Sequence, residues 1–144
     1  MAGKVTRILM DTSMLEKNGR NTLKIVIAGS RTITDITALQ FAIDRSDFPI
    51  TEVVSGCARG VDTLGEQWAN SEGVPVSYWP ANWARFGRAA GKYRNSEMAA
   101  YADGAIVLWD GDSRGTLDMI DRMRRCGKPV EVWMKSGDGF LLIN

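Results

Sequence analysis

Residues 23–31 read LKIVIAGSR, and this short stretch decides the expected fold. Five of its first six residues are apolar. Residues 23–28 therefore predict a strand buried on both faces, as in a parallel sheet. Gly29 follows at once and allows the chain to turn tightly toward a ligand. Ser30 and Arg31 then supply a hydroxyl and a planar cation, two groups that bind phosphate oxygens.

The rest of the chain alternates between short apolar runs and amphipathic segments. Apolar residues recur at helical spacing in three segments, a fourth segment is also expected to be helical, and short apolar runs separate these segments. Such alternation predicts a parallel sheet that is covered by helices on both faces. We therefore expect an α/β fold, a single Rossmann-like domain with a five-stranded, mainly parallel sheet. The expected strands are 23–28, 51–54, 74–79, 105–109 and 129–134, and the expected helices are 35–46, 61–72, 89–101 and 116–125.

The first part of the chain differs from the rest. We interpret residues 1–22 as an N-terminal extension to a domain that covers residues 23–144, which is an ordinary length for one domain. A short strand is expected at residues 4–10. No apolar run approaches the roughly 20 residues of a transmembrane helix. The extension also lacks the apolar centre of a signal peptide. We expect a cytoplasmic protein without membrane association.

The composition argues against several kinds of site. The chain has no histidine, and its two cysteines, Cys57 and Cys126, lie far apart. A zinc site, a Ser-His-Asp triad and a Cys-His pair are therefore not expected, and we predict no metal. Eighteen basic residues face seventeen acidic ones, a balance that does not favour a dedicated duplex-DNA-binding protein. Any acid–base chemistry must use Asp, Glu, Lys or Tyr.

Two further glycine-rich loops follow expected strands. Residues 55–62 read SGCARGVD and open a helix, whose N-terminus favours anions. Residues 110–116 read DGDSRGT and also lead into a helix, where Ser113 and Thr116 can cap the helix or bind phosphate. Asp62 has a purely structural alternative, because a carboxylate in a first turn complements the helix dipole. All three loops are expected in the crevice where the strand order reverses.

Residues 79–95 have a different character, because aromatic and basic residues are interleaved there. Aromatic rings suit base stacking, and the cations suit phosphate. The alternative is that Trp79 and Phe86 belong to the core while the cations form a solvated helix face. Arg94 and Asn95 are expected to turn toward the strand ends. The residues concerned are Trp79, Trp83, Phe86 and Tyr93 with Arg85, Arg88, Lys92 and Arg94.

Together these motifs closely resemble the YspA-like, cpYpsA-related branch of the SLOG superfamily. That superfamily groups the LOG phosphoribohydrolases with the DNA-processing protein DprA. The resemblance covers residues 23–134 and implies a Rossmann-like domain that binds nucleotides or their derivatives. It also implies self-association, so we expect a homo-oligomer. The matching motifs are Gly29-Ser30-Arg31, Ser55-Gly56-x-x-x-Gly60-x-Asp62, Ala90-Gly91-x-x-Arg94-Asn95-x-x-Met98, Ser113-x-Gly115-Thr116 and Gly127-Lys128-Pro129-Val130.

The resemblance implies links to NAD or ADP-ribose metabolism and signalling, often in bacterial conflict systems and phages. We expect a small-molecule nucleotide or ADP-ribose-like ligand and no required cofactor. The expected role is that of a sensor, a carrier or a sequestering protein. The expected ligand-binding residues are Gly29, Ser30, Arg31, Ser55, Gly56, Arg59, Gly60, Asp62, Arg94, Asn95, Ser113, Gly115 and Thr116.

The sequence departs from the LOG enzymes at one position. Those enzymes carry Gly-Thr-x-x-Glu, where the glutamate acts with an arginine in cleaving an N-glycosidic bond. Here Met119 holds the glutamate position and Asp118 precedes it, so Asp118 should point in another direction. A nucleotide N-glycosidase is the alternative function, with Arg94 steadying the phosphate or leaving group and Asp62 or Asp118 as the acid–base. A further alternative, single-stranded nucleic-acid binding through residues 79–94, is not favoured by the near-neutral charge.

Overall fold

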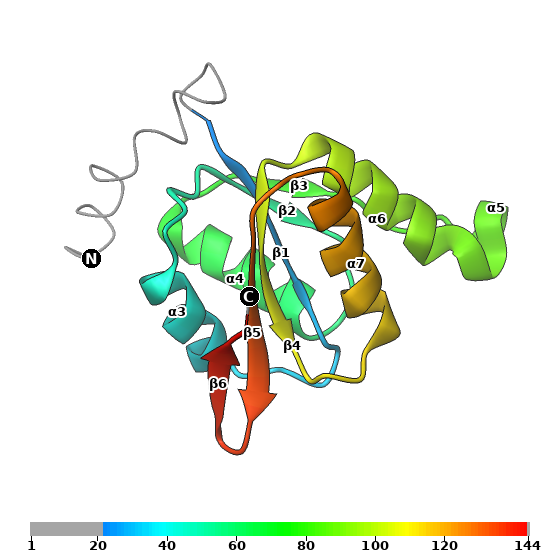
Figure 1. Cartoon of the computed structure of the whole chain (residues 1–144). Helices are drawn as coiled ribbons and strands as arrows, with labels where there is room; N and C mark the ends of the chain where they lie inside the picture. The colour runs from blue at the N-terminus through cyan, green and yellow to red at the C-terminus, as the bar shows by residue number, and fades with distance from the viewer. Residues whose placement is uncertain (1–21, 144) are drawn as a thin grey trace.

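The computed structural model describes residues 22–143, so the strand expected at residues 4–10 lies outside the described residues. One mixed sheet with the strand order β3-β2-β1-β4-β5-β6 forms the centre of the domain (Figure 1). The strands are β1 (Lys24–Gly29), β2 (Glu52–Ser55), β3 (Val76–Tyr78), β4 (Gly104–Trp109), β5 (Val130–Ser136) and β6 (Gly139–Leu142). The helices are α3 (Ile36–Arg45), α4 (Val61–Glu72), α5 (Trp83–Phe86), the 3-10 turn η1 (Gly87–Ala89), α6 (Ala90–Tyr101) and α7 (Arg114–Arg125).

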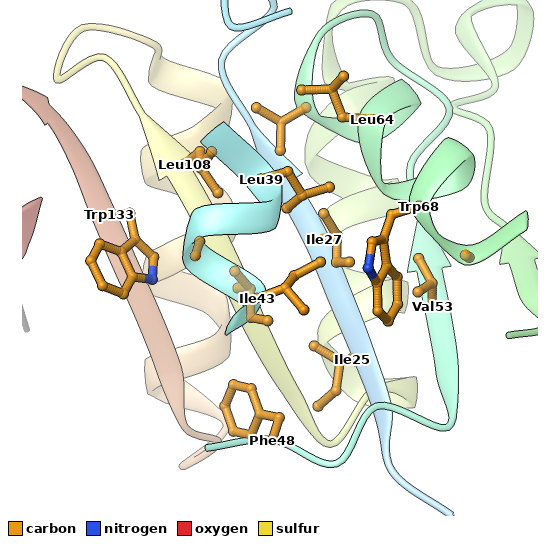
Figure 2. Close-up of a cluster of buried hydrophobic side chains, with 14 of the residues drawn as sticks. Ile25, Ile27, Leu39, Ile43, Phe48, Val53, Leu64, Trp68, Leu108 and Trp133 are labelled. Atoms are coloured by element: carbon orange, nitrogen blue, oxygen red, sulfur yellow. The ribbon is translucent and has the colours of Figure 1, made fainter. Parts of the chain in front are cut away.

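The expected α/β class is confirmed, with helices on both faces of a mainly parallel sheet. Strands β1 to β5 pair in parallel, and β6 is antiparallel to β5. Helices α3 and α4 cover one face, and α6 and α7 cover the other (Figure 1). Successive side chains of β1 point to opposite faces of the sheet. Ile25 and Ile27 pack toward α3 and α4, whereas Val26 packs toward α6 and α7. Figure 2 shows the first of these clusters, in which Leu39 and Trp68 close over the sheet.

The expected number of five strands is wrong, since the described residues form a six-stranded sheet. Residues 139–142 return along β5 through a hairpin in which Ser136 pairs with Gly139. Only two residues, Gly137 and Asp138, connect the strands, and Gly137 has a φ of 57°. Glycine is favoured at such positions in two-residue hairpin turns. The extra strand therefore forms because a favourable two-residue turn follows the last predicted strand, at residues 129–134.

Some boundaries also differ from the expected ones. Helix α7 begins at Arg114 rather than at residue 116, because Ser113 occupies the N-cap position and its side chain accepts from the Thr116 N–H. Strand β3 is limited to three residues at the edge of the sheet. The segment between β3 and α6 contains α5 and η1, two short elements that the sequence pattern did not predict. These elements matter because they border the site described next.

The topology places a crevice beside β1. The chain passes from β1 to β2 and β3 on one side, and it later returns to the other side of β1 as β4. Loops that leave β1 and β4 therefore diverge toward opposite faces, and ligands of open α/β sheets bind between such loops. Here the two loops are tied together, because the Ser30 Oγ accepts a hydrogen bond from the Asp110 N–H at 2.9 Å.

Candidate functional site

A hollow of about 270 Å³ lies beyond the carboxyl ends of β1, β2 and β4, and we call it the main hollow. Its walls come from the three glycine-rich loops, from α5 and α6, and from the first turns of α7. The expected meeting of these loops at one edge of the sheet is therefore observed. The lining residues are Ala28, Gly29, Arg31, Gly56, Ala58, Asp62, Trp83, Arg88, Gly91, Lys92, Arg94, Asn95, Met98, Ser113, Arg114, Gly115, Thr116, Asp118 and Met119.

Two glycines allow the loops to approach one another closely. A Cβ on Gly29 would lie 2.0 Å from the Leu108 carbonyl oxygen and 2.7 Å from a methyl group of Val61. A Cβ on Gly60 would lie 2.4 Å from the Ser30 carbonyl oxygen, and Gly60 also has a φ of 76°. Side chains are excluded at both positions. The N-terminus of α4 can therefore pack directly against the loop after β1.

Two of the three predicted serines, Ser30 and Ser55, lie behind the wall and are fully buried. Ser30 connects the β1 and β4 loops, as described above. The Ser55 hydroxyl donates to Glu66 Oε2 at 2.6 Å and accepts from the Cys57 N–H at 3.1 Å. Both hydroxyls thus shape the loops, and neither residue lines the main hollow.

The centre of the main hollow is formed by Gly56, Asp62 and Arg94. A Cβ on Gly56 would lie 2.8 Å from Arg94 Nη1 and 2.9 Å from Asp62 Oδ2, so the two charged groups flank this glycine. Arg94 Nη1 donates to the Gly56 carbonyl and, at 3.5 Å, to the Trp79 carbonyl. Nη2 of Arg94 has no hydrogen-bond partner within residues 22–143 and remains available to a ligand.

Asp62 is a buried carboxylate with only 5% of its surface exposed. Burial raises the pKa of Asp62 to about 6, and the Ala58 N–H and the Arg94 charge counteract that rise only in part. The Ala58 N–H donates to Oδ2 at 3.2 Å. Helix-dipole complementarity alone does not require such burial. A carboxyl group with a pKa near neutrality can exchange a proton during a reaction.

A chain of hydrogen bonds joins α6 to α7 on the opposite wall. Arg94 Nε donates to Asn95 Oδ1 at 3.0 Å, and Asn95 Nδ2 donates to Asp118 Oδ2 at 2.9 Å. Arg122 Nε donates to the same Asp118 oxygen at 2.9 Å. Asp118 and Met119 both line the main hollow, although Met119 is almost fully buried. The expected turn of Arg94 and Asn95 toward the strand ends is therefore observed.

Positive charge dominates the main hollow. Five cations and two carboxylates are among its lining residues. The side chains of Arg31, Arg88, Lys92 and Arg114 form no hydrogen bond or ion pair with any residue that the structure describes, so their charges are not neutralised locally. Trp83 stands at the same rim with 53% of its surface exposed. An anionic ligand with an aromatic ring suits these surroundings.

The structure thus separates the predicted site residues into three groups. Arg59 lies outside the main hollow and lines a neighbouring depression instead. Ser30, Ser55 and Gly60 support the loops from behind. The remaining predicted residues and Asp118 all line the main hollow, namely Gly29, Arg31, Gly56, Asp62, Arg94, Asn95, Ser113, Gly115 and Thr116.

Several lining residues were not among the predicted site residues. Trp83, Arg88 and Lys92 belong to the aromatic and basic segment, whose composition did indicate a ligand surface. Arg114 directly precedes Gly115 in the third glycine-rich loop. Its place in that loop could have identified it as a site residue. Met98 belongs to the matching motif Arg94-Asn95-x-x-Met98 but was not predicted as a site residue, and Ala58 carries no chemical signal that could have identified it.

Two kinds of feature are absent from residues 22–143. No cluster of three or more Cys, Asp or Glu side chains there could hold a metal ion. No described helix is both long and apolar enough to cross a membrane.

Comparisons with known proteins agree with this architecture. The profile of the YspA, cpYpsA-related SLOG family matches residues 23–86, which include the first two glycine-rich loops. The gene 61 protein of Mycobacterium phage D29 is 35% identical over 117 residues, which covers 74% of this chain and 93% of the phage protein. The crystal structure of DNA processing protein A (DprA) from Streptococcus pneumoniae matches with a TM-score of 0.63 at 18% identity. That match covers 85% of this chain and 52% of DprA, so the chain spans about half of DprA, and the likeness concerns the fold.

Proposed function

This chain belongs to the YspA, cpYpsA-related SLOG family, and we propose that it binds a nucleotide or an ADP-ribose-like derivative in the main hollow. The observation that carries the proposal is the set of unpaired cations around an exposed tryptophan at the reversal of strand order. Phosphates and a base need these two kinds of partner. The expected role is that of a sensor, a carrier or a sequestering protein.

The hollow offers a partner for each part of such a ligand. The phosphate faces Arg31, Arg88 and the first turn of α7, where Ser113 caps the helix and a Cβ added at Gly115 would meet no atom within 4 Å. The base stacks on Trp83 at the rim. Sugar hydroxyls reach the polar inner wall around Asp62.

Arg31→Ala should weaken nucleotide binding by about 10- to 150-fold, the equivalent of a charge-assisted hydrogen bond of about 1.5–3 kcal/mol. Arg31 is exposed and has no hydrogen bond within residues 22–143, so its loss should leave the fold intact. Titration calorimetry with AMP and ADP-ribose measures the effect. Arg124→Ala is the matched control. It also removes one arginine charge, but from the last turn of α7, which does not line the main hollow. Equal affinities of both variants and the wild type would contradict the proposal.

A second function is favoured by one observation, the raised pKa of buried Asp62 inside the hollow. In this alternative Asp62 serves as the acid–base in cleaving the N-glycosidic bond of the bound nucleotide. Arg94 steadies the phosphate or the leaving group, and Asp118 is the second candidate carboxylate. Met119 offers no proton-transferring group at the position where the LOG pattern has glutamate.

An assay for adenine release from AMP distinguishes cleavage from binding. If Asp62 is the acid–base, the wild type releases adenine and Asp62→Asn is slower by at least about 100-fold. AMP that is bound but never broken down would leave binding as the function. Turnover that survives in Asp62→Asn and stops in Asp118→Asn would move the role to the other carboxylate.

A further inference from the structure

A second depression adjoins the main hollow, and we call it the side hollow. It has a volume of about 280 Å³ and lies between the second glycine-rich loop and the segment before α5. Five of its nine lining residues also line the main hollow, so the two spaces are adjoining parts of one groove. The shared residues are Arg31, Gly56, Ala58, Trp83 and Arg94.

The sizes of the hollows indicate that a ligand uses both. Sites that enclose complete small-molecule ligands have volumes of about 300–1,000 Å³. Each hollow alone is slightly smaller than this range, at about 270 and 280 Å³. The joined groove falls inside it. A single nucleoside monophosphate would therefore occupy only one part of the groove.

The chemistry of the junction is anion binding. Arg31 and Arg94 are the two cations that line both hollows, and Trp83 stands beside them. The Arg31 guanidinium and Nη2 of Arg94 are without hydrogen-bond partners among the described residues. A negatively charged linkage placed at this junction would be bound from both arginines.

The side hollow differs from the main hollow in that none of its described lining residues is acidic. Its own residues are Cys57, Arg59, Pro80 and Ala81. Partial burial raises the pKa of the Cys57 thiol, which keeps that thiol protonated near neutral pH. The side hollow thus offers van der Waals contacts to a ligand and one further cation, Arg59, for an anionic group. Its described lining residues include no group suited to proton transfer.

We propose that the ligand has two nucleoside-like units joined by a phosphate-containing linkage, with one unit in each hollow and the linkage between Arg31 and Arg94. The proposal rests on the function proposed above and deepens it, because it assigns a subsite to the side hollow. The linkage is either the pyrophosphate of a free dinucleotide or the phosphodiester of an oligonucleotide. Both place anionic oxygens between two units.

Calorimetric titration with three probes tests this proposal: AMP, NAD and a 5′-phosphorylated dinucleotide with a 3′,5′ linkage. At least one two-unit probe should bind about tenfold or more tightly than AMP, as expected for one added stacking or charged contact. The stronger of the two identifies the linkage. The variant Ala81→Trp fills the side hollow and should abolish this gain while leaving AMP affinity within about twofold of the wild type.

Two further variants make the test specific. Arg59→Ala changes an exposed side chain and should reduce the gain without disturbing packing. Ala84→Trp adds the same bulk to an exposed position of α5 that lines neither hollow, and it should preserve the gain. AMP binding without any gain from a second unit would overturn this inference alone. A gain that persists in Ala81→Trp and Arg59→Ala would also overturn it, and failure of every probe to bind would overturn the proposed function itself.

Discussion

Gly60→Ala should destabilise the fold by about 3–5 kcal/mol, a large part of the roughly 5–15 kcal/mol that stabilises a domain. Gly60 has a φ of 76° and a ψ of −125°, a region that is costly for any residue with a side chain. The added Cβ would also lie 2.4 Å from the Ser30 carbonyl oxygen and 2.6 Å from the Arg31 Cα. Both are backbone atoms, so relief requires the β1 loop and α4 to move apart. Chemical denaturation of both proteins measures the loss.

The variant Gly73→Ala provides a matched control. Gly73 ends α4 with a φ of 71°, and a Cβ added there would meet no atom within 4 Å. It should therefore carry only the left-handed backbone cost of about 1–2 kcal/mol. The difference between the two variants isolates the close approach at Gly60. Equal losses in both would show that the β1 loop and α4 are not held in contact.

The sequence predicted the layered fold because the apolar patterns of its main elements are unambiguous. The run at residues 23–28 is buried on both faces, as β1 requires, and α3, α4 and α7 each bury most of their apolar residues against the sheet, although Ile36 and Leu117 are exposed. The last hairpin was missed because β6 is exposed and pairs with a single neighbour. Its formation depends on the turn at Gly137 and Asp138 and not on hydrophobic periodicity.

The candidate site was predictable at the level of loops and less so at the level of atoms. Glycines and hydroxyl residues occur both in loops that bind phosphate and in loops that only pack tightly. Their presence in the sequence therefore does not distinguish these two roles. Only the structure separates Ser113 at the rim from Ser30 behind the wall. The same holds for Asp62, whose buried carboxylate lies close to Arg94, a residue from another part of the chain. Local sequence contains no direct signal for such long-range desolvation.

Asp62→Asn should remove a pH dependence of stability that the wild type shows between about pH 4 and pH 6. The pKa of Asp62 is raised by burial from 3.8 to about 6 in the folded chain, so within this window the folded state binds more protons than the unfolded state. The free energy of unfolding therefore falls as pH rises, by on the order of 2–3 kcal/mol, and levels off above the folded pKa. The neutral amide does not titrate. Relative to the wild type, the variant should thus gain stability from pH 4 to pH 7.

Urea denaturation at several pH values measures this difference, and Asp35→Asn gives a control of opposite sign. Hydrogen bonds from Thr37 lower the pKa of exposed Asp35 at the start of α3. Its stabilising contribution is present above the unfolded pKa and is lost as pH falls, so Asp35→Asn should matter only above about pH 4 and should reduce stability there. If instead Asp62→Asn ran parallel to the wild type from pH 4 to pH 7, the carboxyl group would have its ordinary pKa. Asp62 would then lack the proton affinity that the glycosidase alternative requires, and the nucleotide-binding proposal would stand without it.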